Sequence, residues 1–238
     1  MKVKLTFKYD GSKFNGFQRQ NDVRSVQKAL EEALSKIYEK DIQIKGAGRT
    51  DTGVHANGQV CHYECNVKIS NLKNKINLLV NPDIYIDRVK YVSDDFHARL
   101  SAKKKEYIYK INLGLFKSSY NDYFYQPRFK LDIGDMRDAA KLFIGTHDFR
   151  NFVSGERDNF VSTVYSITFT KVFDKLEVRF VGSHFYRYMI RNMMGALLEV
   201  GKYSIKRDVI SSMLEDLDTP KTLPTAPACG LYLNKIWY

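Results

Sequence analysis

The sequence predicts an α+β fold of two ferredoxin-like halves, each with the order βαββαβ. Segments in which apolar and polar residues alternate are typical of strands, and segments with apolar residues at helical spacing are typical of helices. These segments follow one another in that order twice, with one extra helix in the second half. We expect the halves to be residues 1–100 and 101–238, with antiparallel sheets whose helix-free faces form a central cleft.

In the first half, alternation begins at once, and Lys2 to Tyr9 is the first expected strand. Ser25 is a suitable N-cap for a helix that ends near Glu39, because apolar residues recur at helical spacing between them. Asn81-Pro82 ends the second expected helix. The other expected elements of this half are strands at 41–47, 58–67 and 84–92 and a helix at 72–80.

The second half repeats this order after a connection at residues 94–101. Residues 145–160 are expected to form a loop, and the chain is interrupted at Thr219-Pro220 and Leu223-Pro224. The expected elements are strands at 105–113, 161–172, 175–181 and 229–237 and helices at 135–144, 184–200 and 206–217.

The composition is that of an ordinary globular protein. The chain has 238 residues, of which 44% are hydrophobic, and this length is sufficient for a large core. No apolar run approaches the length that spans a membrane, and the N-terminus resembles a strand more than a signal peptide. We therefore expect a cytoplasmic protein without a membrane partner. Three cysteines are too few for a disulfide framework.

The charge indicates a polyanionic partner. The net charge is +11, and 13% of the residues are aromatic. A lysine-rich genome would make any protein basic, so the local pattern is more informative. Lys103-Lys104-Lys105 runs directly into Glu106-Tyr107-Ile108-Tyr109, which places cations beside rings that can stack on bases.

The stretch from Gly46 to Ala56 is the most unusual part of the chain. Three glycines, an aspartate and an arginine lie in one short loop between two expected strands. Glycine permits backbone conformations and close approaches that other residues resist. Asp51 on such a loop is therefore held in place, although an aspartate that caps its own turn would look similar.

Other chemistries have less support from the residues. Cys61 and Cys65 lack a second close pair of ligands, so we interpret them as packed thiols and expect no metal site. The glycines lack the ending of a phosphate-binding loop, and no histidine lies in a recognisable triad motif. The lone carboxylate of Asp51 remains. It is ionised at neutral pH and can act as a nucleophile with a cation beside it. The candidate cations are Arg49, Arg187 and Arg191.

Six segments in order along the chain resemble the TruA-type tRNA pseudouridine synthases. They are Tyr9-Asp10-Gly11-Ser12 with Gly16-Phe17-Gln18-x-Gln20, Ala47-Gly48-Arg49-Thr50-Asp51-x-Gly53-Val54-His55-Ala56, Asp95-Phe96-His97-Ala98-Arg99, Tyr107-x-Tyr109, Met189-Ile190-Arg191-Asn192 with Gly195, and Ala226-Pro227-Ala228-x-Gly230-Leu231. The resemblance extends from end to end. RNA-recognition modules share the expected topology of each half.

The resemblance implies isomerisation of uridine to pseudouridine in the anticodon arm of tRNA, at tRNA positions 38 to 40. Asp51 would be the nucleophile, and Tyr107 would stack on the uracil and shuttle a proton. Arg191 would pair with Asp51. Arg49 would fill the gap that the flipped nucleotide leaves. No metal or organic cofactor is implied.

The resemblance also implies a homodimer that binds RNA across both subunits. The expected RNA contacts are Phe96, His97, Ala98, Arg99, Lys103 and Lys105. Phe17, Lys105, Tyr186 and the loop 154–160 depart from the family pattern, which leaves the RNA target open between tRNA and ribosomal RNA. A non-catalytic RNA-binding protein is the alternative of another class. It would favour a Lys/Arg-Gly-Phe run that this chain lacks.

Overall fold

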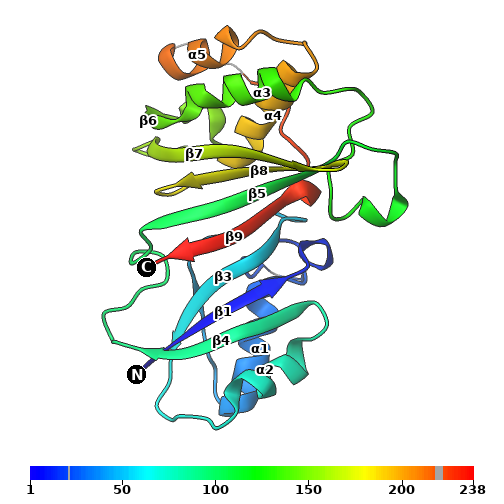
Figure 1. The fold of residues 1–238 in the computed structure, drawn as a ribbon. Coiled ribbons are helices and arrows are strands. Elements are labelled where there is room, and N and C mark those ends of the chain that lie inside the picture. The colour runs from blue at the N-terminus through cyan, green and yellow to red at the C-terminus, as the bar shows by residue number, and fades with distance from the viewer. Residues whose placement is uncertain (21, 218–221) are drawn as a thin grey trace. The chain divides into compact units, whose positions relative to one another are not determined.

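The computed structural model describes residues 1–20, 22–217 and 222–238, which form two compact units (Figure 1). Unit 1 consists of Met1–Lys103 and Tyr232–Tyr238, and unit 2 of Lys104–Leu231. The sequence places the boundary at residue 100 and the last strand in the second half. The structure instead groups residues 232–238 with unit 1, because that strand pairs with a strand there. The interruption expected at Thr219-Pro220 lies outside the described residues.

Unit 1 has the predicted order of strand, helix, strand, strand, helix and strand, so that expectation is confirmed here. Its elements are β1 (Lys2–Tyr9), α1 (Val26–Tyr38), β2 (Lys45–Gly46), β3 (His55–Glu64), α2 (Leu72–Val80) and β4 (Ile84–Val92), together with β9 (Leu231–Trp237).

The sheet of unit 1 has the order β4-β1-β3, and both β2 and β9 pair with β3. The pairings are antiparallel except for β3 with β9, which is parallel. Along β1, Val3, Leu5 and Phe7 are fully buried and alternate with more exposed polar residues. The apolar face is thus packed in the core with α1 and α2, and the other face is polar.

Helix α1 begins and ends as its sequence predicts. The hydroxyl of Ser25 accepts a hydrogen bond from the backbone N–H of Lys28 at 3.3 Å. The helix ends at Glu39, which adopts a left-handed conformation with φ 54°. Leu30 and Leu34 are fully buried, so one side of the helix packs in the core.

The strand expected at 41–47 is wrong for most of its length. Ile42 and Ile44 are buried as predicted. Their backbone N–H groups, however, donate to the side chains of Ser35 at 2.9 Å and Glu31 at 3.1 Å, both on α1. Only Lys45–Gly46 therefore pair with a neighbouring strand, β3.

The strands of unit 2 follow the order β5-β8-β7-β6, with antiparallel pairing. Its elements are β5 (Lys104–Asn112), α3 (Ile133–Ala140), β6 (Gly145–Asp148), β7 (Val161–Val172), β8 (Lys175–Gly182), α4 (Met189–Gly201) and α5 (Asp208–Glu215). The extra helix predicted for the second half is α5. The core contains Tyr109, Phe143 and Phe180, all fully buried.

Two expectations for unit 2 are wrong. Residues 145–148 form β6 on the edge of the sheet rather than a loop. Their sequence, Gly-Thr-His-Asp, gives no apolar alternation, because an edge strand need not bury either face. Helix α4 begins at Met189 and not at 184, because Tyr188 adopts a left-handed conformation with φ 62° that ends regular helix geometry on its N-terminal side.

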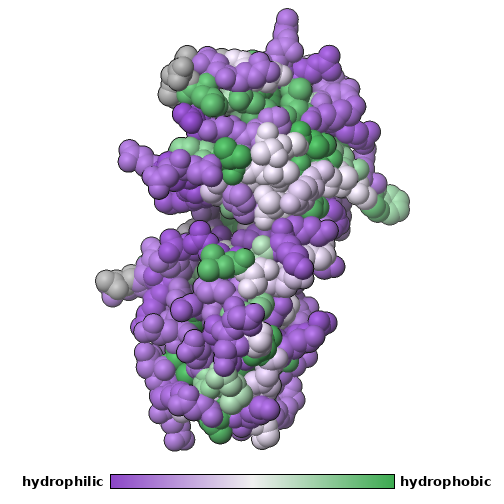
Figure 2. Space-filling view, turned by 90° about the vertical axis from the view of Figure 1, so that its left-hand side faces the viewer, coloured by the Kyte–Doolittle hydropathy of each residue, from purple (hydrophilic) through white to green (hydrophobic). Residues whose placement is uncertain are grey.

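On the face shown in Figure 2, the surface of both units is mainly hydrophilic, and hydrophobic residues lie among the hydrophilic ones. Among the described helices, none combines the length and apolar character needed to cross a bilayer. Cys61 and Cys65 are buried free thiols, as predicted.

Candidate active site

Asp51 lies in the loop 47–54 that connects β2 to β3, and its side chain is half-buried. The loop is fixed where it leaves β2, because the N–H of Ala47 donates to the carbonyl of Val60 at 2.8 Å. It closes in a turn in which the N–H of Val54 donates to the carbonyl of Asp51 at 3.1 Å. Gly53 in this turn has φ 79°, a conformation that favours glycine. The local sequence thus forces a tight turn directly after Asp51.

Thr50, the residue before Asp51, is held by two other parts of unit 1. Its hydroxyl is 2.8 Å from the hydroxyl of Tyr9, which lies at the end of β1. Its carbonyl accepts a hydrogen bond from the N–H of Phe17 at 3.0 Å. Gln59 adds a further bond from Nε2 to the carbonyl of Gly48 at 3.0 Å. Hydrogen bonds from outside the loop therefore fix the backbone next to Asp51.

Glycines allow the segment 10–17 to lie against this loop. A Cβ on Gly16 would be 2.9 Å from the carbonyl oxygen of Thr50, and a Cβ on Gly11 would be 2.1 Å from that of Val54. The N–H of Gly11 also donates to Nδ1 of His55 at 3.0 Å. The two glycine-containing motifs at 9–18 and 47–56 are thus parts of one packed structure.

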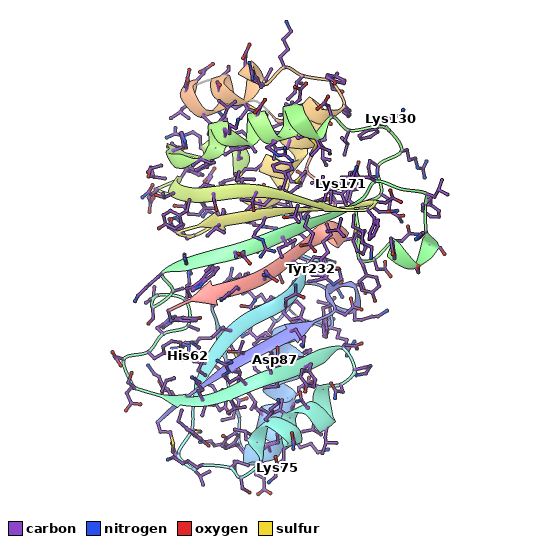
Figure 3. The ribbon with its side chains drawn as sticks, viewed as in Figure 1. His62, Lys75, Asp87, Lys130, Lys171 and Tyr232 are labelled. Carbon is purple, nitrogen blue, oxygen red and sulfur yellow. The ribbon has the colours of Figure 1, made fainter. Side chains whose placement is uncertain are left out.

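The groups around the loop are polar and buried. Burial raises the pKa of Tyr9 to about 12, so its hydroxyl keeps its proton at neutral pH. His55 is 2% exposed and stacks on Tyr232, which Figure 3 labels, with ring centroids 4.5 Å apart. Its Nδ1 accepts the N–H of Gly11, so its proton is on Nε2 when the ring is neutral. Arg49, in contrast, is exposed.

Tyr107 lies on β5 in unit 2, opposite Phe180 of β8. It is 8% exposed, and its ring contacts Phe185 edge-on, with centroids 5.5 Å apart and planes at 84°. The contact with Phe185 and the strand pairing with β8 hold the tyrosine ring in place.

Arg191 lies in the first turn of α4 in unit 2 and is half-buried. Its Nε donates to the carbonyl of Ala226 at 2.8 Å, and its own carbonyl accepts the N–H of Ala226 at 3.0 Å. Its guanidinium carbon is 4.8 Å from the ring centroid of Tyr188. Gly195, one turn later, permits this contact, because a Cβ there would lie 1.9 Å from the carbonyl oxygen of Pro224. The segment 224–227 thus orients the guanidinium.

The segment predicted to contact RNA, residues 96–99, forms a turn over β3. The N–H of Ala98 donates to Nδ1 of His62 at 3.1 Å, and its carbonyl accepts the hydroxyl of Tyr238 at 2.9 Å. The ring of Phe96 lies 5.1 Å from that of Tyr238. Ala98 is fully buried, so its methyl group supports the turn. Arg99 is exposed.

His97 and the two lysines of the predicted RNA contacts differ in exposure. His97 is half-buried, with its ring centroid 4.7 Å from that of His62. Lys103 is exposed in unit 1, whereas Lys105 is 8% exposed on β5 in unit 2. In the loop 154–160, the guanidinium carbon of Arg157 lies 4.4 Å from the ring centroid of Tyr186.

Asp51, Arg49 and the turn 96–99 thus belong to unit 1, and Tyr107 and Arg191 belong to unit 2. Sequence reasoning missed the supporting bonds from Tyr9 and Gln59 to the loop, because their partners lie elsewhere along the chain. In the part of the chain that the structure describes, no three His, Cys, Asp or Glu side chains gather as a metal site would require.

Comparison with known sequences gives full-length relatives. A family described as tRNA pseudouridine synthase matches residues 5–100 and 139–238. The tRNA pseudouridine synthase A of Bacillus subtilis is 40% identical over 248 residues, which cover 100% of this chain and 99% of that protein. The protein of the same name from Pseudothermotoga lettingae is 43% identical and covers 96% of each chain.

Among solved structures, an H/ACA RNP bound to a substrate RNA containing 2′-deoxyuridine matches with a TM-score of 0.37 and 13% identity. The match covers 83% of this chain and 53% of that one.

Proposed function

The chain belongs to the tRNA pseudouridine synthase family, and on that premise we propose that it isomerises uridines in the anticodon arm of tRNA with Asp51 as nucleophile. It is an isomerase that acts on tRNA. The observation that carries the assignment of Asp51 is the rigid support of its loop. Hydrogen bonds to Thr50, Gly48 and Ala47 hold a half-buried carboxylate in one place.

The reaction is an isomerisation in which one bond to C1′ replaces another, so no second substrate has to give or take a group. The C1′–N1 bond of uridine breaks, the uracil turns, and C5 bonds to C1′ while the proton at C5 leaves and N1 gains one. Asp51 serves this step either by attack on C1′ or by removal of the C2′ proton to give a glycal. In both routes the carboxylate must be ionised and oriented toward the sugar before the reaction. A fixed loop supplies that orientation.

Arg191 is the proposed partner that keeps the Asp51 carboxylate ionised in the reacting complex. A guanidinium lowers the pKa of a nearby carboxyl and holds its two oxygens in a fixed geometry. Support comes from the way Arg191 is held, since Ala226 and Tyr188 both fix its side chain.

Tyr107 and Arg49 are the proposed contacts of the uridine itself. Tyr107 would stack on the uracil and pass the proton that leaves C5, and its contact with Phe185 supports a ring held in a fixed position. Removing a nucleotide from its stack costs a few kcal/mol. Arg49, exposed and two residues before Asp51, would occupy the vacated position.

The proposal includes a homodimer that needs no cofactor, as the resemblance implies, and a location in the cytoplasm, as expected from the N-terminal sequence. Light scattering of the purified chain, alone and with tRNA, tests the dimer, and a monomer under both conditions would contradict it.

The test of the function uses the purified chain with unmodified transcripts of its own tRNAs and of ribosomal RNA. Pseudouridine is mapped by carbodiimide modification and primer extension. We expect conversion in the anticodon arm of tRNA and none in ribosomal RNA. Asp51→Asn should abolish this conversion. Its control, Asp41→Asn, changes an exposed aspartate of unit 1 to its amide and should convert tRNA at the normal rate. Conversion of ribosomal RNA alone would overturn the assignment of the substrate.

A further inference from the structure

Three cations lie together on the polar face of the unit 1 sheet, and the mechanism above uses none of them. Lys4 of β1 is directly opposite Lys90 of β4 in the strand register. Thr6 is opposite Arg88, which places Arg88 one pleat farther along on the same face. Arg88 and Lys90 are exposed, and Lys4 is half-buried. We refer to Lys4, Arg88 and Lys90 as the basic strip.

The basic strip is an arrangement that disfavours folding. Like charges directly opposite each other on neighbouring strands destabilise a sheet. Burial, with the charges of Lys90 and Arg88, lowers the pKa of Lys4. Across residues 1–20, 22–217 and 222–238, no member of the strip forms an ion pair with an acid. The positive charge of the strip is therefore uncompensated within the described residues.

The acids closest to the strip along the chain have other partners. Asp87, beside Arg88 in the sequence, lies 3.1 Å from Nζ of Lys8. Asp94 lies 3.6 Å from the N-terminal amine. Neutralisation of the strip thus requires an anion from outside.

Aromatic rings hold Lys4 at one end of the strip. Its Nζ lies 3.5 Å from the ring centroid of Tyr238 and 4.9 Å from that of Phe96. Such contacts orient an ammonium group without neutralising it. Because Phe96 belongs to the turn 96–99, the strip is continuous with the segment predicted to contact RNA.

We propose that the basic strip binds backbone phosphates of the tRNA at a distance from the uridine that is isomerised. This inference rests on the proposed function. In the strand register, Lys4 is opposite His62 of β3. Strand β3 begins at His55, directly after the Asp51 loop, and His62 lies seven residues farther along it. At about 3.3 Å per residue, the strip is on the order of 20 Å along the sheet from that loop. The strip would therefore position the tRNA and take no part in the chemistry.

Phosphate is the ligand that best fits the strip. Lysine ammonium groups are compact charges with no fixed donor geometry, which suits phosphate oxygens better than base edges. Two of the three cations are exposed on a sheet face, so a convex stretch of nucleic acid backbone can reach them together.

The test compares two triple variants that both change the net charge from +11 to +8. The strip variant is Lys4→Gln with Arg88→Gln and Lys90→Gln. The control is Lys36→Gln with Lys40→Gln and Lys75→Gln, which alters exposed lysines on or after α1 and on α2. In Figure 3, Lys75 lies on α2 and well apart from His62. Both variants are measured for tRNA affinity at several salt concentrations.

We expect the strip variant to bind tRNA about 10- to 100-fold more weakly at physiological salt, with a salt slope reduced by about 2 to 3. The control variant should bind within about threefold of the unaltered chain, with the same slope. At saturating tRNA, kcat should be unchanged in both, because the strip does not touch the reacting atoms.

A single variant separates loss of binding from loss of folding. Lys90→Gln removes the like-charge pair, so we expect its melting temperature to rise by about 1–3 °C. Its tRNA affinity should nevertheless fall. A lower melting temperature would contradict the view that the strip is uncompensated.

Equal weakening in both triple variants would overturn the proposal, since overall charge would then explain the binding. Unchanged tRNA affinity in the strip variant would overturn the proposal too. That result would hold even if the strip were found to bind another anionic surface, such as anionic vesicles, instead of tRNA. These outcomes are independent of the proposed function, because affinity is measured whether or not pseudouridine forms.

Discussion

Asp51 and Arg191 are positioned by different means, and the difference follows from the kind of element that carries each. Asp51 is on a loop, and side-chain hydrogen bonds from Tyr9 and Gln59 hold that loop. Arg191 is on helix α4, and the segment that contains Ala226 holds it through hydrogen bonds to its backbone and its Nε. A loop can turn a carboxylate sharply toward a substrate, but it needs buried polar partners. A helix needs only one neighbour to fix a long side chain.

Glycine substitutions test the support of the Asp51 loop and the support of Arg191, and they should have the largest effect on stability. Gly11→Ala and Gly195→Ala would place a Cβ 2.1 Å and 1.9 Å from backbone oxygens. Each should lower the free energy of unfolding by about 3 kcal/mol, because backbone must move to relieve the overlap. The measurement is denaturation in urea.

Gly155→Ala is the control for these two substitutions. Gly155 has φ 90°, but nothing lies within 4 Å of the position that its new methyl group would take. We therefore expect only backbone strain to lower the free energy of unfolding of this variant, by about 1–2 kcal/mol. Equal losses in all three variants would show that the close approaches at Gly11 and Gly195 have no special weight.

Arg191→Lys tests the helix-borne group. Lysine keeps the charge but cannot donate to Ala226 through Nε while presenting a planar fork to a carboxylate. We expect kcat to fall about 100-fold, which corresponds to about 2.7 kcal/mol, with tRNA affinity little changed. Arg207→Lys, at an exposed arginine of unit 2 just before α5, should keep kcat within a factor of about two. An Arg191→Lys variant with full kcat would remove the proposed role of the guanidinium.

Tyr9→Phe tests the loop support with a smaller change. It removes one hydroxyl and leaves that of Thr50, which is 8% exposed, without its partner. The expected loss of stability is about 1–2 kcal/mol, and kcat should fall about tenfold as the loop loses its fixed position.

The control for Tyr9→Phe is Tyr203→Phe, whose hydroxyl bonds to Asp132 on the surface. We expect it to change stability by less than about 0.5 kcal/mol and to leave kcat unchanged. If Tyr9→Phe lost stability but kept full kcat, the hydroxyl would be structural only.

A further prediction concerns the pH dependence of stability and involves unit 1 alone. Burial, followed by the charges of His97, Lys2 and Lys45, lowers the pKa of His62 to about 4. The unfolded value is about 6.5, so the unfolded chain binds more protons between these values. His62 therefore adds a stability that is complete above a pH of about 6.5 and is lost as the pH falls toward about 4.

Chemical denaturation of the unaltered chain and His62→Gln between neutral pH and a pH of about 4.5 measures this contribution. We expect the stability of the unaltered chain to decline more steeply on acidification than that of the variant, which keeps an acceptor for the N–H of Ala98. Parallel pH profiles would show that folding does not shift the pKa of His62.

The fold could be predicted where a single element carries its own pattern. Alternation located β1, and apolar spacing with the Ser25 cap located α1. Prediction failed where tertiary partners decide the backbone. Residues 41–44 bond to side chains of α1 instead of a strand, and β6 forms at a sheet edge without apolar alternation. The start of α4 depends on the left-handed Tyr188.

The candidate site was predictable to a similar extent. The glycine spacing around Asp51 indicated a shaped loop, and the residues alone offered Arg49, Arg187 and Arg191 as cations. Tyr107 and the choice of Arg191 came from the family resemblance, and their roles stay predictions. The supports from Tyr9 and Gln59 could not be found in advance, since their hydrogen bonds to the loop depend on how β1 and β3 pair. The basic strip likewise depends on the register that brings Lys4 opposite Lys90.

The most direct test of the account is Asp51→Asn, measured by tritium release from C5-labelled uridine in tRNA. The amide keeps the size of the side chain but cannot act as the nucleophile. The account predicts a loss of tritium release of at least about 10⁴-fold, together with tRNA affinity close to that of the unaltered chain. Measurable turnover by this variant, at a rate within about 100-fold of normal, would contradict the central role of the Asp51 carboxylate.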